Sequence, residues 1–201
     1  MLNLQLSAFS TLINSFFWNY FNQNDMILTI RKKSLIHCCV SSLFGILYLS
    51  NLISKESQGY ILNYSLGYII HDFYIYTFKK ELYDEKYITY LHHGLFLIGV
   101  LKYDKFPNLY SNLILAEIST IPLNLQYIYR KNKNLKIKFS LLFYILFLIL
   151  RIGNCNYILY NMILTDEYSN YIIFSMFIFS SLNGYWFHLM TKKLMRFIKN
   201  K

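Results

Sequence analysis

Seven long apolar stretches, separated by short charged gaps, run along the 201-residue chain. A helix needs about 20 mostly apolar residues to cross the hydrocarbon core of a bilayer. Charged residues make up 15% of the chain, whereas ordinary soluble domains have about a quarter. We therefore predict an all-α fold, a polytopic transmembrane helical bundle or barrel of about seven spans, or six if the polar first stretch does not cross. The expected spans are 4–22, 34–53, 59–78, 88–101, 107–129, 137–156 and 169–190.

The basic residues lie in alternate gaps. Sixteen of the 20 Lys and Arg residues fall after the first, third and fifth spans or in the C-terminal tail, and the gap after the first span is expected to hold Arg31, Lys32 and Lys33. Because positive residues stay in the cytoplasm, we expect a cytoplasmic C-terminus. A net charge of +10 could indicate nucleic acid, but its confinement to the gaps argues against such a partner.

Ionisable and amide side chains interrupt the apolar stretches. Such groups are costly in hydrocarbon, so they normally face a bundle interior or a wet cavity and pair with one another. We predict that side chains from separate helices meet in one intramembrane pocket. The expected polar cluster consists of His71, Asp72, Glu117, Ser119, Asn124, Arg151 and Asn183.

Helical spacing predicts which of these groups share a face. Tyr68, Asp72 and Tyr76 are four residues apart and lie on one face, with His71 about 100° away. Asp72 and Glu117 are each expected to pair with a histidine or with Arg151. A carboxylate bound to one imidazole nitrogen would leave the other free as a general base or, less commonly, a nucleophile.

Two other interpretations of the polar residues stay open. They could serve only to hold helices together, or several His, Asp and Glu could bind a metal. His92 and His93 are adjacent, so they point in different directions and lack the i, i+4 spacing of paired ligands. We therefore predict no metal site. Pro122 is expected to kink the fifth span or force a local adjustment there.

Several motifs together resemble the TLC-domain membrane proteins, which include the ceramide synthases and a set of smaller TLC-domain-containing proteins. The matching residues run in family order: Ser34-Leu35-Ile36-His37, Tyr68 through Asp72, His92-His93, Glu117 through Asn124, Arg151, and Asn183-Gly184-Tyr185-Trp186-Phe187. On this resemblance we assign residues 31–198 to a TLC domain and 1–30 to a preceding transmembrane helix and loop. His37, Pro122 and Trp186 are expected to be structural.

The resemblance also implies a function. TLC domains form a helical barrel around a lipid-sized cavity, often in the endoplasmic reticulum. Ceramide synthases N-acylate a long-chain base with acyl-CoA and depend on a histidine pair, which corresponds here to His92 and His93. This chain lacks the downstream aspartate pair of the synthases, and its Glu117 segment is similar to that of the smaller proteins, whose roles concern membrane lipid composition.

We therefore expect a protein that binds or handles acyl lipid, with membrane lipids and fatty acyl chains as partners and no cofactor. The alternative is an acyl-CoA-dependent N-acyltransferase in which His92 and His93 are catalytic. In that case Lys79, Lys80 and Lys86 would attract the phosphates of the acyl-CoA. A transporter, channel or cargo receptor is a third class, but the chain shows no clear internal repeat.

Overall fold

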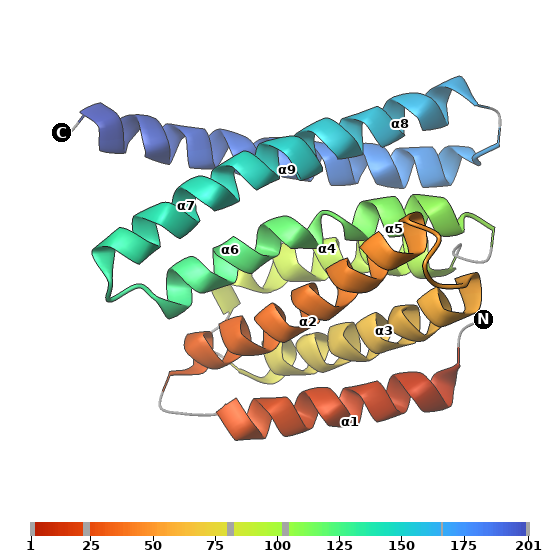
Figure 1. The fold of residues 1–201 in the computed structure, drawn as a ribbon, viewed down its shortest axis with the longest axis horizontal. Coiled ribbons are helices and arrows are strands. Elements are labelled where there is room, and N and C mark those ends of the chain that lie inside the picture. The colour runs from red at the N-terminus through yellow and green to blue at the C-terminus, as the bar shows by residue number, and fades with distance from the viewer. Residues whose placement is uncertain (1–2, 22–24, 80–82, 102–104, 166, 200–201) are drawn as a thin grey trace.

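The computed structural model describes residues 3–21, 25–79, 83–101, 105–165 and 167–199. Within these residues every regular element is a helix, and the helices run back and forth along one axis (Figure 1). Their bounds are α1 (Leu4–Phe21), α2 (Met26–Leu49), α3 (Lys55–Phe78), α4 (Tyr83–Leu101), α5 (Pro107–Ile114), α6 (Glu117–Ile128), α7 (Lys133–Phe147), the π-helix η2 (Leu148–Gly153), α8 (Asn154–Leu164) and α9 (Asn170–Lys199).

Each expected span overlaps a helix or a run of helices. The sixth is one rod in which α7, η2 and α8 follow without a break, whereas the fifth is divided between α5 and α6. At this division the N–H groups of Ile118 and Ser119 bond carbonyls three residues back, at 3.1 Å each, instead of four. Pro122, which lacks an N–H and crowds the preceding turn, lies within α6. The sequence predicted that Pro122 would kink the fifth span or change its hydrogen bonding locally. The structure has such a change one to two turns before the proline.

The gap expected after the first span is shorter than predicted. Helix α2 begins at Met26, and the Asp25 side chain caps it by accepting a hydrogen bond from the Leu28 N–H at 2.9 Å. An aspartate directly before a run of apolar residues is a strong N-cap. The basic run Arg31-Lys32-Lys33 thus belongs to α2, so its predicted place in the gap between the first two spans was wrong.

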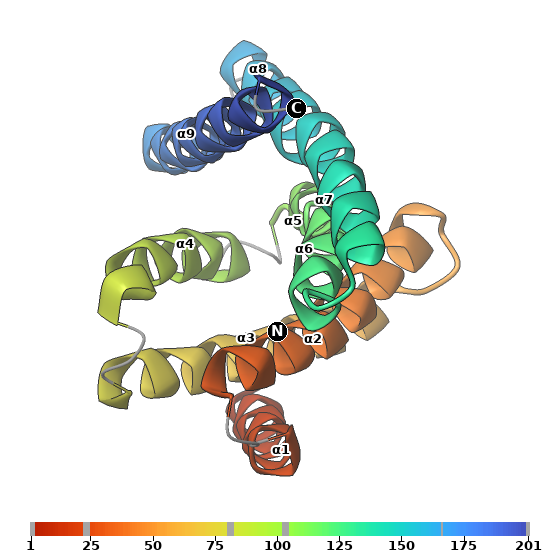
Figure 2. The ribbon, with the colours of Figure 1, turned by 90° about the vertical axis from the view of Figure 1, so that its left-hand side faces the viewer.

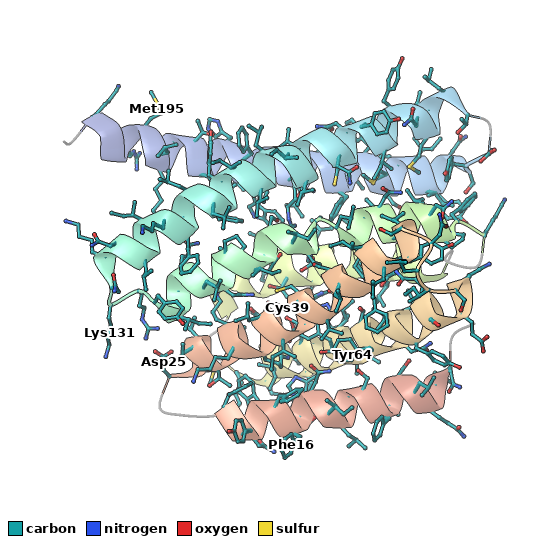
Figure 3. All side chains as sticks on the ribbon, viewed as in Figure 1. Phe16, Asp25, Cys39, Tyr64, Lys131 and Met195 are labelled. Carbon is teal, nitrogen blue, oxygen red and sulfur yellow. The ribbon has the colours of Figure 1, made fainter. Side chains whose placement is uncertain are left out.

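The helix rods run alternately toward one end of the bundle and toward the other. The C-terminal ends of α1, α3, α6 and α9 lie at one end, which we call the basic end, on the left of Figure 1. Asp25, Lys131 and Met195 lie there in Figure 3. The described basic residues that follow α6, and those in the last turns of α9, therefore lie toward one end, as the charge pattern predicts. Lys80, Lys102 and Lys201 lie outside the described residues.

One helix in the described part of the chain, over Asn170–Arg196, has the length and apolar composition of a membrane span. Other helices carry more polar residues. Helix α3, for example, buries Gln58, Asn63, His71 and Asp72, and such residues lower its mean hydropathy.

The helices form a ring, seen from the basic end in Figure 2. Around the ring, α3, α2, α6, α7 with η2, α9 and α4 contact one another in turn, and α4 closes it against α3. Helix α1 lies outside the ring and packs on α3. That contact depends on small residues, because a Cβ at Gly67 would lie 2.4 Å from Ser10 Cβ. Close backbone approach at small residues is typical of packing between membrane helices.

Candidate functional site

A cavity of about 400 Å³ lies inside the ring. Pockets of roughly 300–1,000 Å³ are typical of small-molecule sites. Side chains from α2, α3, α4, α6, α7, η2 and α9 line this central cavity. Its polar lining consists of Arg31, Ser34, His37, Tyr68, Asp72, Tyr76, Thr89, His92, His93, Glu117, Thr120 and Arg151. Ionisable groups from separate helices therefore meet around one void.

Asp72 is the carboxylate at the α3 side of the central cavity. Its Oδ1 forms an ion pair with Lys33 Nζ of α2, and its Oδ2 lies 3.3 Å from His93 Nε2 of α4. Lys33 Nζ also lies 2.8 Å from His71 Nδ1. The side chains of Lys33 and Asp72 are 1% and 6% exposed, so this ion pair is shielded from solvent. The sequence predicted the histidine partner but not the lysine, which was assigned to a loop.

Aromatic contacts hold the histidines of this side in place. The His37 ring stacks on the Tyr68 ring, with centroids 3.9 Å apart and planes 8° from parallel. The His93 ring meets Tyr68 edge-on at 6.2 Å and Phe73 at 5.8 Å. Together with Asp72, these contacts restrict the orientation of the His93 imidazole.

His92 faces a different neighbour. Its ring packs on Phe179 and Trp186 of α9, with centroids 5.8 and 5.9 Å away, whereas His93 turns toward α3. The adjacent histidines thus diverge, as their spacing predicts, but both line the central cavity. The Nδ1 atom of His92 is buried and has no hydrogen-bond partner among the described residues. A buried polar atom of this kind is unfavourable unless a ligand or water satisfies it.

Arg151 lies in the π-helical turn η2, opposite α6. Its Nε donates to Ser119 Oγ at 3.0 Å, and its Nη2 donates to Thr120 Oγ1 at 2.9 Å and lies 3.4 Å from Glu117 Oε1. The planar guanidinium is suited to such a fork of partners. A π-bulge is often found at a functional site. Here the π-helical turn contains Arg151, which pairs with Glu117. The sequence predicted that Glu117 would pair either with a histidine or with Arg151.

Some residues of the predicted cluster lie away from the void. Asn124 donates to Ser34 Oγ of α2 at 3.0 Å. His71 faces Trp18 of α1, with ring centroids 6.1 Å apart. Asn183 is fully buried, and neither of its amide atoms has a partner among the described residues.

The residues assigned structural roles differ as well. His37 and Trp186 line the central cavity, whereas Pro122 is buried in α6 away from it. His188 is exposed on α9. Among the described residues, no three His, Cys, Asp or Glu side chains are placed to hold a metal ion.

A second, apolar pocket of about 80 Å³ adjoins the central cavity. The two share His92, Phe96 and Glu117. This apolar branch runs away from the basic end, among side chains of α4, α5, α8 and α9 such as Leu95 and Met176. The arrangement therefore places a small apolar space on one side of His92 and a cavity with ionisable walls on the other.

The sequence profile of the TLC domain matches residues 28–192. The chain belongs to the TLC domain family. This protein is therefore a membrane protein of a lipid-related family, and all residues that line its central cavity lie within the matched range. No curated protein and no solved structure matches the chain.

Proposed function

We propose that this TLC-domain protein binds an acyl lipid in the central cavity and contributes to membrane lipid homeostasis. The observation that carries the proposal is that a cavity with ionisable groups in its wall joins an apolar branch at His92. An amphipathic lipid has the same division, with the end of its chain for the branch and a polar group for the ionisable part of the central cavity.

The polar side should determine which lipid is retained. An acyl chain that leaves the bilayer for a protein cavity exchanges one apolar medium for another, so burying its methylenes contributes little. A hydrogen bond to a buried atom that otherwise lacks a partner contributes more, roughly 1–3 kcal/mol. His92 Nδ1 is such an atom, and Arg151 and Thr120 lie on the opposite wall.

Mass spectrometry of lipids that co-purify with the protein tests this proposal. His92→Ala should reduce retained lipid several-fold, whereas His188→Ala, on the exposed face of α9, should not. Ser175→Phe should fill the apolar branch, which Ser175 lines, and lower retention, whereas Ser181→Phe on the same helix is exposed and should be neutral. A folded wild-type protein that carries no lipid would refute the proposal.

A second candidate function is acyl transfer from acyl-CoA to the amine of a long-chain base. The distance of 3.3 Å between Asp72 Oδ2 and His93 Nε2 favours it, because a carboxylate orients an imidazole for general-base work. The imidazole would take the amine proton as the C–N bond forms, and the proton would leave with the thiolate when the C–S bond breaks. Labelled acyl-CoA should then give a product that His92→Ala and His93→Ala each abolish. Full turnover in both variants would exclude this function.

We further propose that the helix rods cross the membrane of the endoplasmic reticulum, with the basic end in the cytoplasm. The gathering of basic gaps at one end supports this orientation, and the family resemblance supports the compartment. A Lys192→Cys variant, made in a background without native cysteines, should react with an impermeant thiol reagent on the cytoplasmic side of sealed microsomes. If the Lys192→Cys variant is labelled only from the luminal side, the basic end lies in the lumen and the proposed orientation is wrong.

A further inference from the structure

A third pocket, of about 570 Å³, lies at the basic end between α6, α7 and α9. We call it the lysine pocket, because Lys133, Lys136 and Lys193 line it. It shares Leu123, Phe143 and Met190 with the central cavity. The lysine pocket, the central cavity and the apolar branch therefore follow one another through the protein.

The charge of the lysine pocket is not neutralised by its own walls. All three lysines are exposed, and none forms an ion pair with a carboxylate within the described residues. No Asp or Glu is among the described lining residues. Lys133 is also the first residue of α7, where the positive end of the helix dipole adds to the potential. The pocket is thus suited to an anion, and in particular to a phosphate group with several acceptor oxygens.

We propose that the lysine pocket binds the phosphate of an amphiphile whose ester group and acyl chain pass Leu123 and Phe143 into the central cavity, so that the ester faces His92 and the end of the chain reaches the apolar branch. This inference rests on the proposed lipid-binding function and adds the chemistry of the polar end. It also replaces an expectation from the sequence, since Lys79 lines neither the lysine pocket nor the central cavity. Lys80 and the side chain of Lys86 lie outside the described residues. The phosphate belongs either to a phospholipid or to a soluble compound.

Two lipids with the same acyl chains test the inference, phosphatidic acid and diacylglycerol, because they differ in the phosphate alone. Delipidated protein is incubated with phosphatidylcholine vesicles that contain a trace of one or the other, and the retained lipid is measured after repurification. Wild-type protein should retain phosphatidic acid better than diacylglycerol. Lys136→Gln/Lys193→Gln should lower phosphatidic acid retention roughly thirty-fold, since each lysine near a membrane surface contributes about 1 kcal/mol and about 1.4 kcal/mol corresponds to a factor of ten. It should leave diacylglycerol retention unchanged.

Lys138→Gln/Lys192→Gln is the matched control. It removes the same charge from the same two helices, at exposed residues that do not line the lysine pocket. An equal loss in the control would reveal a general attraction of basic residues to anionic lipid and would overturn the inference, as would unchanged retention in the pocket variant. If wild-type protein retains neither lipid, the proposed function fails as well, whereas equal retention of both lipids refutes the phosphate site alone.

Pyrophosphate separates the two sources of phosphate. If millimolar pyrophosphate displaces phosphatidic acid from wild-type protein and binds the Lys136→Gln/Lys193→Gln variant more weakly, the pocket accepts soluble phosphates. If it does not compete while the dependence on the lysines holds, the pocket is specific for the headgroup of a lipid.

Discussion

Removing the buried Lys33 ammonium should destabilise the protein more than any other single charge deletion in α2. Lys33 is 1% exposed, its ammonium pairs with Asp72, and it lies 4.7 Å from the centre of the Tyr68 ring. In Lys33→Met, the Asp72 carboxylate keeps His93 at 3.3 Å as its described partner and loses its compensating charge. Removing one partner of a buried ion pair costs about 3–5 kcal/mol.

The expected cost corresponds to a fall in Tm of about 6–20 °C for a chain of this size. Thermal unfolding of the detergent-purified protein, followed by a thiol-reactive dye or by size-exclusion chromatography after heating, measures it. Lys32→Met is the control, because this neighbour is half-buried and its ammonium lies over the Phe21 ring at 5.5 Å. It should change Tm by no more than about 2 °C, because Lys32 forms no ion pair with a described carboxylate and a partly solvated charge contributes little.

A double variant tests whether the cost comes from the pair. Lys33→Met/Asp72→Asn removes both charges, so it should be more stable than the sum of the two single variants predicts, with a coupling energy of about 2 kcal/mol or more. Additive single effects, or a Lys33→Met protein that unfolds within about 2 °C of wild type, would refute the proposed role of the pair.

Three further substitutions, one of them with a matched control, have expected outcomes in the same thermal assay. Arg151→Lys loses the planar fork toward α6 and should cost about 1–3 kcal/mol, and a wild-type Tm would show that one ammonium satisfies all three partners. Gly67→Ala places a Cβ 2.4 Å from Ser10 Cβ and should cost about 1–3 kcal/mol, whereas Gly59→Ala, with open space around it, should be neutral or stabilise α3. Asp25→Ala removes the N-cap of α2 and an ion pair with Arg130 at 2.5 Å, and should cost about 1–2 kcal/mol; an unchanged Tm would mean that solvent replaces the cap.

Local pattern was sufficient to predict the helices and much of the local pairing. Apolar stretches of membrane length located each rod, and the alternate basic gaps predicted which connections share an end. Helical spacing placed Tyr68, Asp72 and Tyr76 on one face, and all three line the central cavity. The pairing of Glu117 with Arg151 followed from the cost of leaving either group alone in an apolar interior.

Other features depended on how the helices are turned against one another. The periodicity of a helix shows which residues share a face, but not which neighbour that face meets. Lys33 is the partner of Asp72 because it lies within α2, on the side that faces α3. Asn124 contacts Ser34 of α2, although it follows Glu117 by seven residues and shares a face of α6 with it.

The lysine pocket shows the same limit. Lys133 and Lys193 are 60 residues apart in the chain, and they line one pocket because α9 returns along the rod that α7, η2 and α8 form. The sequence alone determined the elements, their direction and the faces they offer. The tertiary structure decided which faces meet, because the rotation and order of helices in a ring depend on contacts between side chains far apart in the chain.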